Sequence, residues 1–294
     1  MPRKNYDGFD DLTVNSSPLK SNPTIDLYNY LLSVEDKLPL KSLAKSGVIA
    51  SPELSSLVAL YSVSGIKDSG NFFKKATDSN SIHADVWSKV VLKEVMIKEL
   101  SNKWCDFNVE KIDVRLITRL KELSITAEGI KSVSEVLQSI GVILVYVPTV
   151  NSAKIDGMVG RTNTGRPYIA MTLRHNRLDN FWFSLLHEIG HLKYHFLLLD
   201  SPIVENLDEV STNDMEIEAN KFALTAFIPR RLWSRTSLKF GLQNNEKLFE
   251  VSNELGVHPS IVAGRLRRDK QDYRLYSDVI SEFDTRTILF EGNK

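Results

Sequence analysis

The chain has 294 residues, with 37 Lys and Arg against 37 Asp and Glu, and 42% of its residues are hydrophobic. These values exclude a chain that is disordered throughout, and the balanced charge argues against a protein that binds polyanions through its overall charge. The single cysteine, Cys105, cannot form an intramolecular disulfide, which suits a reducing compartment. The longest purely apolar run, 142–147, is far shorter than the ~20 residues of a membrane helix, and no apolar run follows the N-terminal charges. We therefore expect a cytoplasmic protein with no membrane partner.

The first half of the chain predicts helices. Residues 1–24 are rich in Asp, Asn, Ser and Pro, with no apolar period, and are expected to form a flexible tail. Apolar residues then recur at three- and four-residue spacing, and longer helices are expected over 86–100 and 114–123. The sequence therefore predicts a helical N-terminal region over 25–106.

The pattern changes from helix to strand near Gly141. The run 142–147 is rich in β-branched residues and predicts a buried strand, and short strands over 155–159 and 168–171 flank a turn that is typical of a hairpin. Two helices, 180–199 and 213–228, follow with a polar linker between them. Residues 246–268 predict two helices joined at Gly256. The expected fold class is α+β, with a helical C-terminal segment over 241–294.

A short motif in the helix expected over 180–199 carries the predicted chemistry. His187, Glu188 and His191 form an H-E-x-x-H motif. Residues four apart lie within about 40° of each other around a helix, so both imidazoles project from one face and can bind one ion. Glu188 projects about 100° away from His187, which suits a general base beside a metal rather than a ligand. The alternative is a pair of buried, hydrogen-bonded core histidines.

The helix expected over 213–228 offers a third ligand, because two histidines leave a tetrahedral zinc site one protein ligand short. Glu216 lies on the side of this helix that carries Phe227, and a carboxylate on an apolar face is costly unless it is paired or bound to a metal. We interpret Glu218, on the polar side, as a solvated surface charge. Asn220 is placed either to orient a ligand histidine or to make a simple buried hydrogen bond. The predicted cofactor is Zn²⁺, although the same ligand set forms open iron sites.

Three stretches of the chain resemble the ImmA/IrrE family of zinc metallo-endopeptidases. Residues 174–192 hold the H-E-x-x-H motif, residues 216–229 hold the acidic motif, and residues 255–266 are similar to the C-terminal segment of the family. The resemblance covers about residues 107–268. It implies a thermolysin-like zincin fold, in which a small antiparallel sheet packs on the H-E-x-x-H helix, and a zinc metallopeptidase domain over 107–240.

The same resemblance implies the roles of the site residues. His187, His191 and Glu216 are implied to bind Zn²⁺, and Glu188 is implied to be the catalytic base. Members of the family are implied to cut helix-turn-helix repressors in stress, mobile-element or phage-defence regulation. The expected partner is therefore a protein substrate, a helix-turn-helix repressor.

The donor that stabilises the oxyanion of peptide hydrolysis is less clearly marked in the sequence. Tyr194 and His195 lie on the same helix as the two histidines, and His175, Arg174 and Tyr168 lie near the predicted hairpin. For each of them, packing or a surface position is the alternative role. The strand over 168–173 either offers an edge to an extended substrate or is paired on both sides.

The C-terminal segment supports an alternative function. Its two helices resemble a DNA-binding helix-turn-helix, and residues 230–270 hold nine Lys and Arg against four acids. These charges either contact DNA phosphates or stabilise helix C-termini. The alternative is a DNA-binding or antitoxin-like transcriptional regulator with a non-catalytic zinc site, for which Arg265, Arg267 and Arg268 would be required. The sequence leaves the oligomeric state open.

Overall fold

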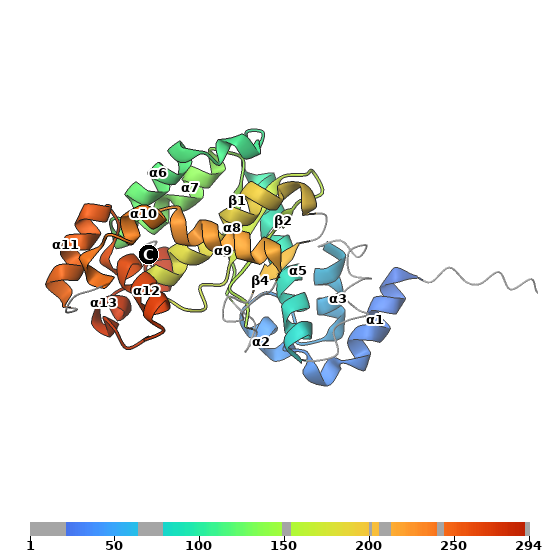
Figure 1. Cartoon of the computed structure of the whole chain (residues 1–294). Coiled ribbons are helices and arrows are strands. Elements are labelled where there is room, and N and C mark those ends of the chain that lie inside the picture. The colour runs from blue at the N-terminus through green and yellow to red at the C-terminus, as the bar shows by residue number, and fades with distance from the viewer. Residues whose placement is uncertain are drawn as a thin grey trace, which may run out of the picture.

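The structure, a computed structural model, describes residues 22–63, 79–148, 154–199, 202–205, 213–239 and 244–291 (Figure 1). The predicted tail lies almost wholly outside these residues. The N-terminal helices are α1 (Pro23–Ser33), α2 (Leu40–Lys45), α3 (Leu54–Val63) and α5 (Ser79–Ser101). The expected helix over 86–100 is thus the later part of α5.

The helices that follow agree with most of the expected ranges. Helix α6 (Val114–Leu123) has the predicted bounds, and α7 (Val133–Gln138) was not predicted. The expected helices over 180–199 and 213–228 are α8 (Leu178–His195) and α9 (Asp214–Thr225). The C-terminal helices are α10 (Arg230–Trp233), α11 (Asn245–Leu255), α12 (Pro259–Lys270), α13 (Ser277–Ser281) and α14 (Thr285–Phe290), and α11 and α12 meet at Gly256 as expected.

Within the described residues, the sheet has four strands in the order β1-β3-β2-β4, formed by β1 (Ile143–Tyr146), β2 (Gly157–Arg161), β3 (Pro167–Met171) and β4 (Ile203–Glu205). Strands β2 and β3 form the predicted hairpin, and β4 pairs antiparallel with β2. The expectation of an antiparallel sheet is wrong for one pair, because β1 and β3 are parallel. The chain leaves β1 and runs back along β2 before it enters β3, so β3 has the direction of β1. Strand β3 is paired on both sides and offers no edge to a substrate.

Alternate residues of the sheet face two different cores, as the period of two in a strand requires. One face packs against α8 and the C-terminal helices through Leu144, Val159, Ile169 and Met171. The other packs against the N-terminal helices through Ile143, Val145, Met158, Tyr168 and Ala170. The sheet therefore lies between two helical layers. The division of the chain at 106–107 stays a prediction, since the N-terminal helices share this core with the sheet.

A hydrogen bond links the N-terminal helices to the sheet. The indole N–H of the fully buried Trp87, in α5, donates to the carbonyl of Val147, which ties the N-terminal helices to the end of β1. In the part of the chain that the structure describes, no helix has both the length and the apolar character that spanning a bilayer requires.

Candidate metal centre

The site forms where α8 and α9 lie side by side (Figure 1). Gly190 on α8 makes this close approach possible: a Cβ at this position would lie 3.1 Å from the Cα atom of Ala219 on α9. Because Ala219 is three residues after Glu216, the same approach brings the Glu216 carboxylate to the face of α8 that carries the H-E-x-x-H histidines.

The three side chains predicted as ligands converge from the two helices. The Nε2 atoms of His187 and His191 lie 3.0 Å apart, and each lies 3.3 Å from an oxygen of Glu216. All three residues are buried, and their ligand atoms lie within 4.8 Å of one another. Both histidines therefore present the same ring nitrogen to one point, as a shared ion requires.

The chemistry of this donor set fits a divalent metal ion. Two imidazole nitrogens and one carboxylate are the protein ligands of many catalytic zinc sites, which keep a further position for water. Burial, the main influence, lowers the pKa of His191, although the hydrogen bond to Glu216 opposes the shift. The neutral imidazole that results is the form that binds a metal. His187, His191 and Glu216 could thus hold the ion.

Glu188 lies on the side of α8 that faces the sheet. Its side chain is fully buried, and its Oε1 atom would lie 2.1 Å from a Cβ added at Gly157, the first residue of β2. Glycine at position 157 therefore leaves the room that this carboxylate occupies. No local pattern in the sequence marks Gly157, because only the pairing of β2 with β3 brings it over α8.

Behind His191, two further residues form a hydrogen-bonded chain. The Nδ1 atoms of His191 and His195 lie 3.1 Å apart, and Nε2 of His195 lies 3.0 Å from Oε2 of Glu218. Both ring nitrogens of His195 are thus engaged, which does not fit the role of oxyanion donor suggested for it above. Glu218 is 61% exposed, as expected of a solvated surface charge, and it also contacts His195. The sequence does contain a signal for the contact between His191 and His195, because His187, His191 and His195 follow each other at intervals of four residues and so share one face of the helix.

Among the described residues, Asn220 makes neither the orienting contact nor the buried hydrogen bond that were the two alternatives for it. It is half-buried on α9, and within the described ranges its side chain makes no hydrogen bond. Tyr194 packs edge-on against Phe222 of α9 at 5.8 Å between ring centres, and it is 51% exposed. A role for Tyr194 as oxyanion donor stays a prediction.

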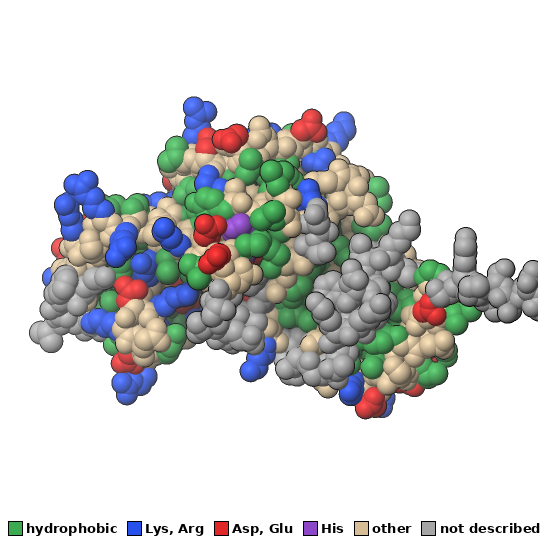
Figure 2. Space-filling view, turned by 45° about the vertical axis from the view of Figure 1, so that its right-hand side comes forward, with side chains coloured by type: hydrophobic (Ala, Val, Ile, Leu, Met, Phe, Trp, Pro, Cys, Tyr) green, Lys and Arg blue, Asp and Glu red, His purple; other side chains and the backbone are tan. Residues whose placement is uncertain are grey.

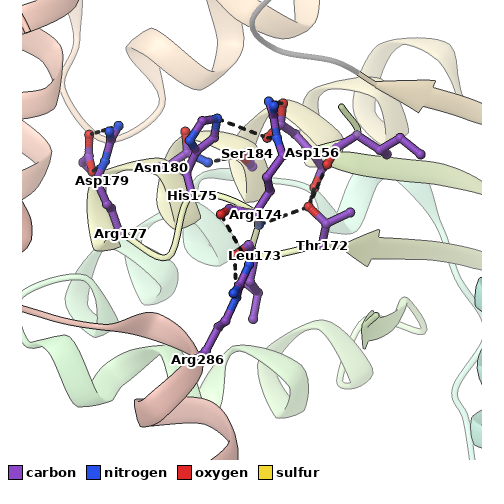
Figure 3. A network of polar contacts seen from close by, with 11 residues as sticks. Asp156, Thr172, Leu173, Arg174, His175, Arg177, Asp179, Asn180, Ser184 and Arg286 are labelled. Atoms are coloured by element: carbon purple, nitrogen blue, oxygen red, sulfur yellow. Dashed lines mark hydrogen bonds and ion pairs between the residues drawn. The ribbon is translucent and has the colours of Figure 1, made fainter. Parts of the chain in front are cut away.

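His175 and Arg174 belong to a polar network at the start of α8 (Figure 3). Arg174 donates two hydrogen bonds to the buried carboxylate of Asp156, and Nε2 of His175 lies 3.8 Å from the same carboxylate. Asp156 directly precedes Gly157, so the network adjoins the strand against which Glu188 lies. Tyr168 points to the opposite face of the sheet and is fully buried.

The three arginines considered for DNA binding make contacts within the chain. Arg265 donates to the carbonyl of Leu224 and pairs with Asp269, and Arg267 is buried and donates to the carbonyl of Leu275. The guanidinium of Arg268 lies over the ring of Phe183, 4.6 Å from its centre. Helix α12 thus turns these side chains toward the protein, and DNA binding stays a prediction.

The comparison with known families agrees with this geometry. Residues 143–267 match the model of the peptidase M78 family, described as the IrrE N-terminal-like domain. This part of the chain is similar to the IrrE N-terminal-like domain. The match confirms the family expected from the sequence and supports a metallopeptidase-like function. Neither the comparison with curated proteins nor that with solved structures gave a match.

The region that matches this family model runs from β1 to the later part of α12. It contains the sheet, the three candidate ligands, Glu188 and the hydrogen-bonded residues His195 and Glu218. The N-terminal helices, α13 and α14 lie outside the matched residues, although α14 contacts the loop before α8 through hydrogen bonds from Arg286 to the carbonyls of Leu173 and Arg174 (Figure 3).

Proposed function

We propose that the protein is a cytoplasmic, zinc-dependent endopeptidase that cleaves a regulatory protein, a helix-turn-helix transcriptional repressor. One observation carries the proposal: His187, His191 and Glu216 form a buried cluster whose ligand atoms lie within 4.8 Å of one another, and the buried Glu188 directly follows His187 on α8. A structural zinc site is closed by four protein ligands, whereas three ligands and an adjacent carboxylate suit hydrolysis.

The residues of the site have separate tasks in this reaction. Zinc, when bound by His187, His191 and Glu216, lowers the pKa of water to about 7 and polarises a peptide carbonyl. Glu188 accepts the proton of the attacking water and delivers it to the nitrogen of the departing amine. Gly157 gives the Glu188 carboxylate its room, and His195 orients the ring of His191.

The substrate class rests on the resemblance to the ImmA/IrrE family, together with the match of residues 143–267 to the IrrE N-terminal-like domain. Proteolysis of a repressor is irreversible, so a narrow choice of substrate suits a regulatory enzyme. A candidate substrate is a repressor encoded next to this chain.

The test is incubation of the purified chain with such a repressor. We expect the zinc-loaded wild type to cut it at one or few sites, and a chelator to abolish cleavage. Glu188→Gln should bind zinc as the wild type does and cut at a rate lower by at least 10²-fold, a loss typical of a missing acid–base group. Equal cleavage by both proteins, or no cleavage by a wild type that holds one zinc per chain, contradicts the proposal.

A further inference from the structure

Arg268 places a positive charge close to the candidate metal centre. It comes from the end of α12, and its guanidinium carbon lies 4.6 Å above the ring centre of Phe183 on α8. Phe183 precedes His187 by four residues, and the two ring centres are 6.4 Å apart. Arg268, Phe183 and His187 therefore form three successive layers along one face of α8.

The guanidinium of Arg268 is available to a ligand. It makes no hydrogen bond and no ion pair with any residue in the described part of the chain, whereas Arg265 and Arg267 on the same helix are both engaged. Asp269, the acid that follows Arg268 in the sequence, already accepts hydrogen bonds from Arg265 and from the indole of Trp233. The five N–H donors of Arg268 thus lack an internal acceptor among these residues.

An arginine in this setting is poorly solvated as well as unpaired. Arg268 is half-buried, and burial is the main influence that lowers its pKa. The contact with Phe183 supplies a cation–π interaction of about 0.5–1 kcal/mol, which does not replace hydrogen bonds to the guanidinium. A carboxylate would satisfy it best, because the planar fork of arginine binds both oxygens at once.

We infer that Arg268 binds a carboxylate of the peptide substrate and so determines specificity at the proposed peptidase site. This inference rests on the proposed function. The carboxylate is either an Asp or Glu side chain or the C-terminus of the peptide, and the chemistry that recognises it is the same. Lys and Arg side chains gather on the side of the C-terminal helices in Figure 2, which favours the approach of an anionic segment from that side.

The distances limit where this carboxylate lies along the substrate. The guanidinium carbon of Arg268 lies 4.6 Å from the ring centre of Phe183, and this ring centre lies 6.4 Å from that of His187. An extended peptide advances about 3.3 Å per residue, so the two distances together span about three residues. We expect the recognised carboxylate within three residues of the cleaved bond. Arg268 itself lies just past the residues that match the family, which end at 267.

The experiment measures binding of ligands that are anchored on the metal. Short alanine peptides carry a hydroxamate, which binds zinc, at the C-terminal end in one series and at the N-terminal end in the other. One alanine at a time is replaced by Asp, Asn or Lys, and the second series is made with a free or an amidated C-terminus. Dissociation constants are measured on the zinc-loaded wild type, Arg268→Met and Arg268→Glu, with Arg265→Met as the matched control on the same helix.

We expect one carboxylate position at which the charged ligand binds the wild type at least tenfold more tightly than its neutral counterpart. Arg268→Met should reduce this preference to less than threefold and leave the affinity for the neutral ligand unchanged, which shows that the site is intact. Arg268→Glu should prefer Lys at that position, and Arg265→Met should behave as the wild type. Equal binding of charged and neutral ligands at every position, or a preference that survives in Arg268→Met, overturns the inference. Because this readout is binding, it can fail while cleavage of a repressor succeeds, and the reverse also holds.

Discussion

The Nδ1 atom of His191 lies 3.1 Å from Nδ1 of His195, on the side of the ring opposite to Glu216. When Nε2 of His191 binds a metal, its Nδ1 carries the proton and donates to His195, which in turn donates to Glu218. This chain fixes the tautomer and the orientation of a ligand histidine. Such outer contacts change metal affinity about 10- to 100-fold.

We therefore expect His195→Ala to weaken zinc binding by about 10- to 100-fold. Competition with a zinc-binding dye measures the affinity directly, without a substrate. Asn220→Ala is the control, because within the described ranges the Asn220 side chain makes no hydrogen bond. The zinc affinity of Asn220→Ala should stay within about twofold of that of the wild type. Equal affinities of the wild type and His195→Ala would contradict the orienting role.

A methyl group at Gly157 should misplace the general base. The added Cβ would lie 2.1 Å from Oε1 of Glu188, so Gly157→Ala must displace this carboxylate or shift the strand. Since misplacement by about 1 Å costs about 10²-fold in rate, we expect a loss of that size in kcat with unchanged zinc content. Rates of repressor cleavage measure it.

Unfolding in urea provides a second measurement for Gly157→Ala. Overpacking costs about 1–3 kcal/mol, so the free energy of unfolding should fall by that amount in the wild-type background. In a Glu188→Ala background the same change should cost much less, because the clashing carboxylate is gone. If Gly157→Ala lowers the free energy of unfolding equally in both backgrounds, the added methyl group does not clash with Glu188.

Removal of the carboxylate of Glu216 should abolish stable metal binding. We expect one zinc per chain for the wild type by elemental analysis and less than a tenth of that for Glu216→Ala after dialysis. Glu218→Ala, two residues away, should keep its zinc. A ligand at 1,000 times its Kd stabilises the folded state by about 4 kcal/mol, so a chelator should lower the Tm of the wild type and leave that of Glu216→Ala unchanged. Full zinc content in Glu216→Ala would refute the ligand set.

The stability of the C-terminal helices should depend on the protonation of His258. Its Nδ1 accepts a hydrogen bond from the backbone N–H of Ser260 at the start of α12, and burial lowers its pKa. The unfolded chain, with an ordinary pKa of about 6.5, therefore binds more protons than the folded chain below that pH. The free energy of unfolding should fall as the pH drops from about 6.5 toward the lower folded-state pKa.

Urea unfolding at pH 7.5 and at pH 5.0 tests this dependence. His258→Asn keeps a side chain that can cap the helix but does not titrate. Between pH 7.5 and pH 5.0, the free energy of unfolding should therefore fall by about 1 kcal/mol less in His258→Asn than in the wild type, which is the typical contribution of one N-cap. The metal-free protein is used for both variants, so that loss of zinc at low pH does not contribute. Identical changes in the two proteins would exclude His258 as the cause.

Much of the local structure could be predicted because it depends on neighbours in the chain. The period of apolar residues predicted the bounds of α6, and it predicted the bounds of α8 and α9 to within a few residues. The turn sequence predicted the β2–β3 hairpin. Helix α7 and strand β4 were missed because each is short. The direction of β1 was missed because its partner, β3, lies beyond an intervening strand.

The sequence by itself determined that His187 and His191 share one face of a helix, since a spacing of four residues fixes their side chains within a single turn of backbone. Only the tertiary structure decided what surrounds that face. The crossing of α8 and α9 at Gly190 and Ala219 brings Glu216 to the histidines, β2 places Gly157 against Glu188, and α12 places Arg268 over Phe183. These contacts join residues far apart in the chain, and they are set by which surfaces pack together rather than by any local period.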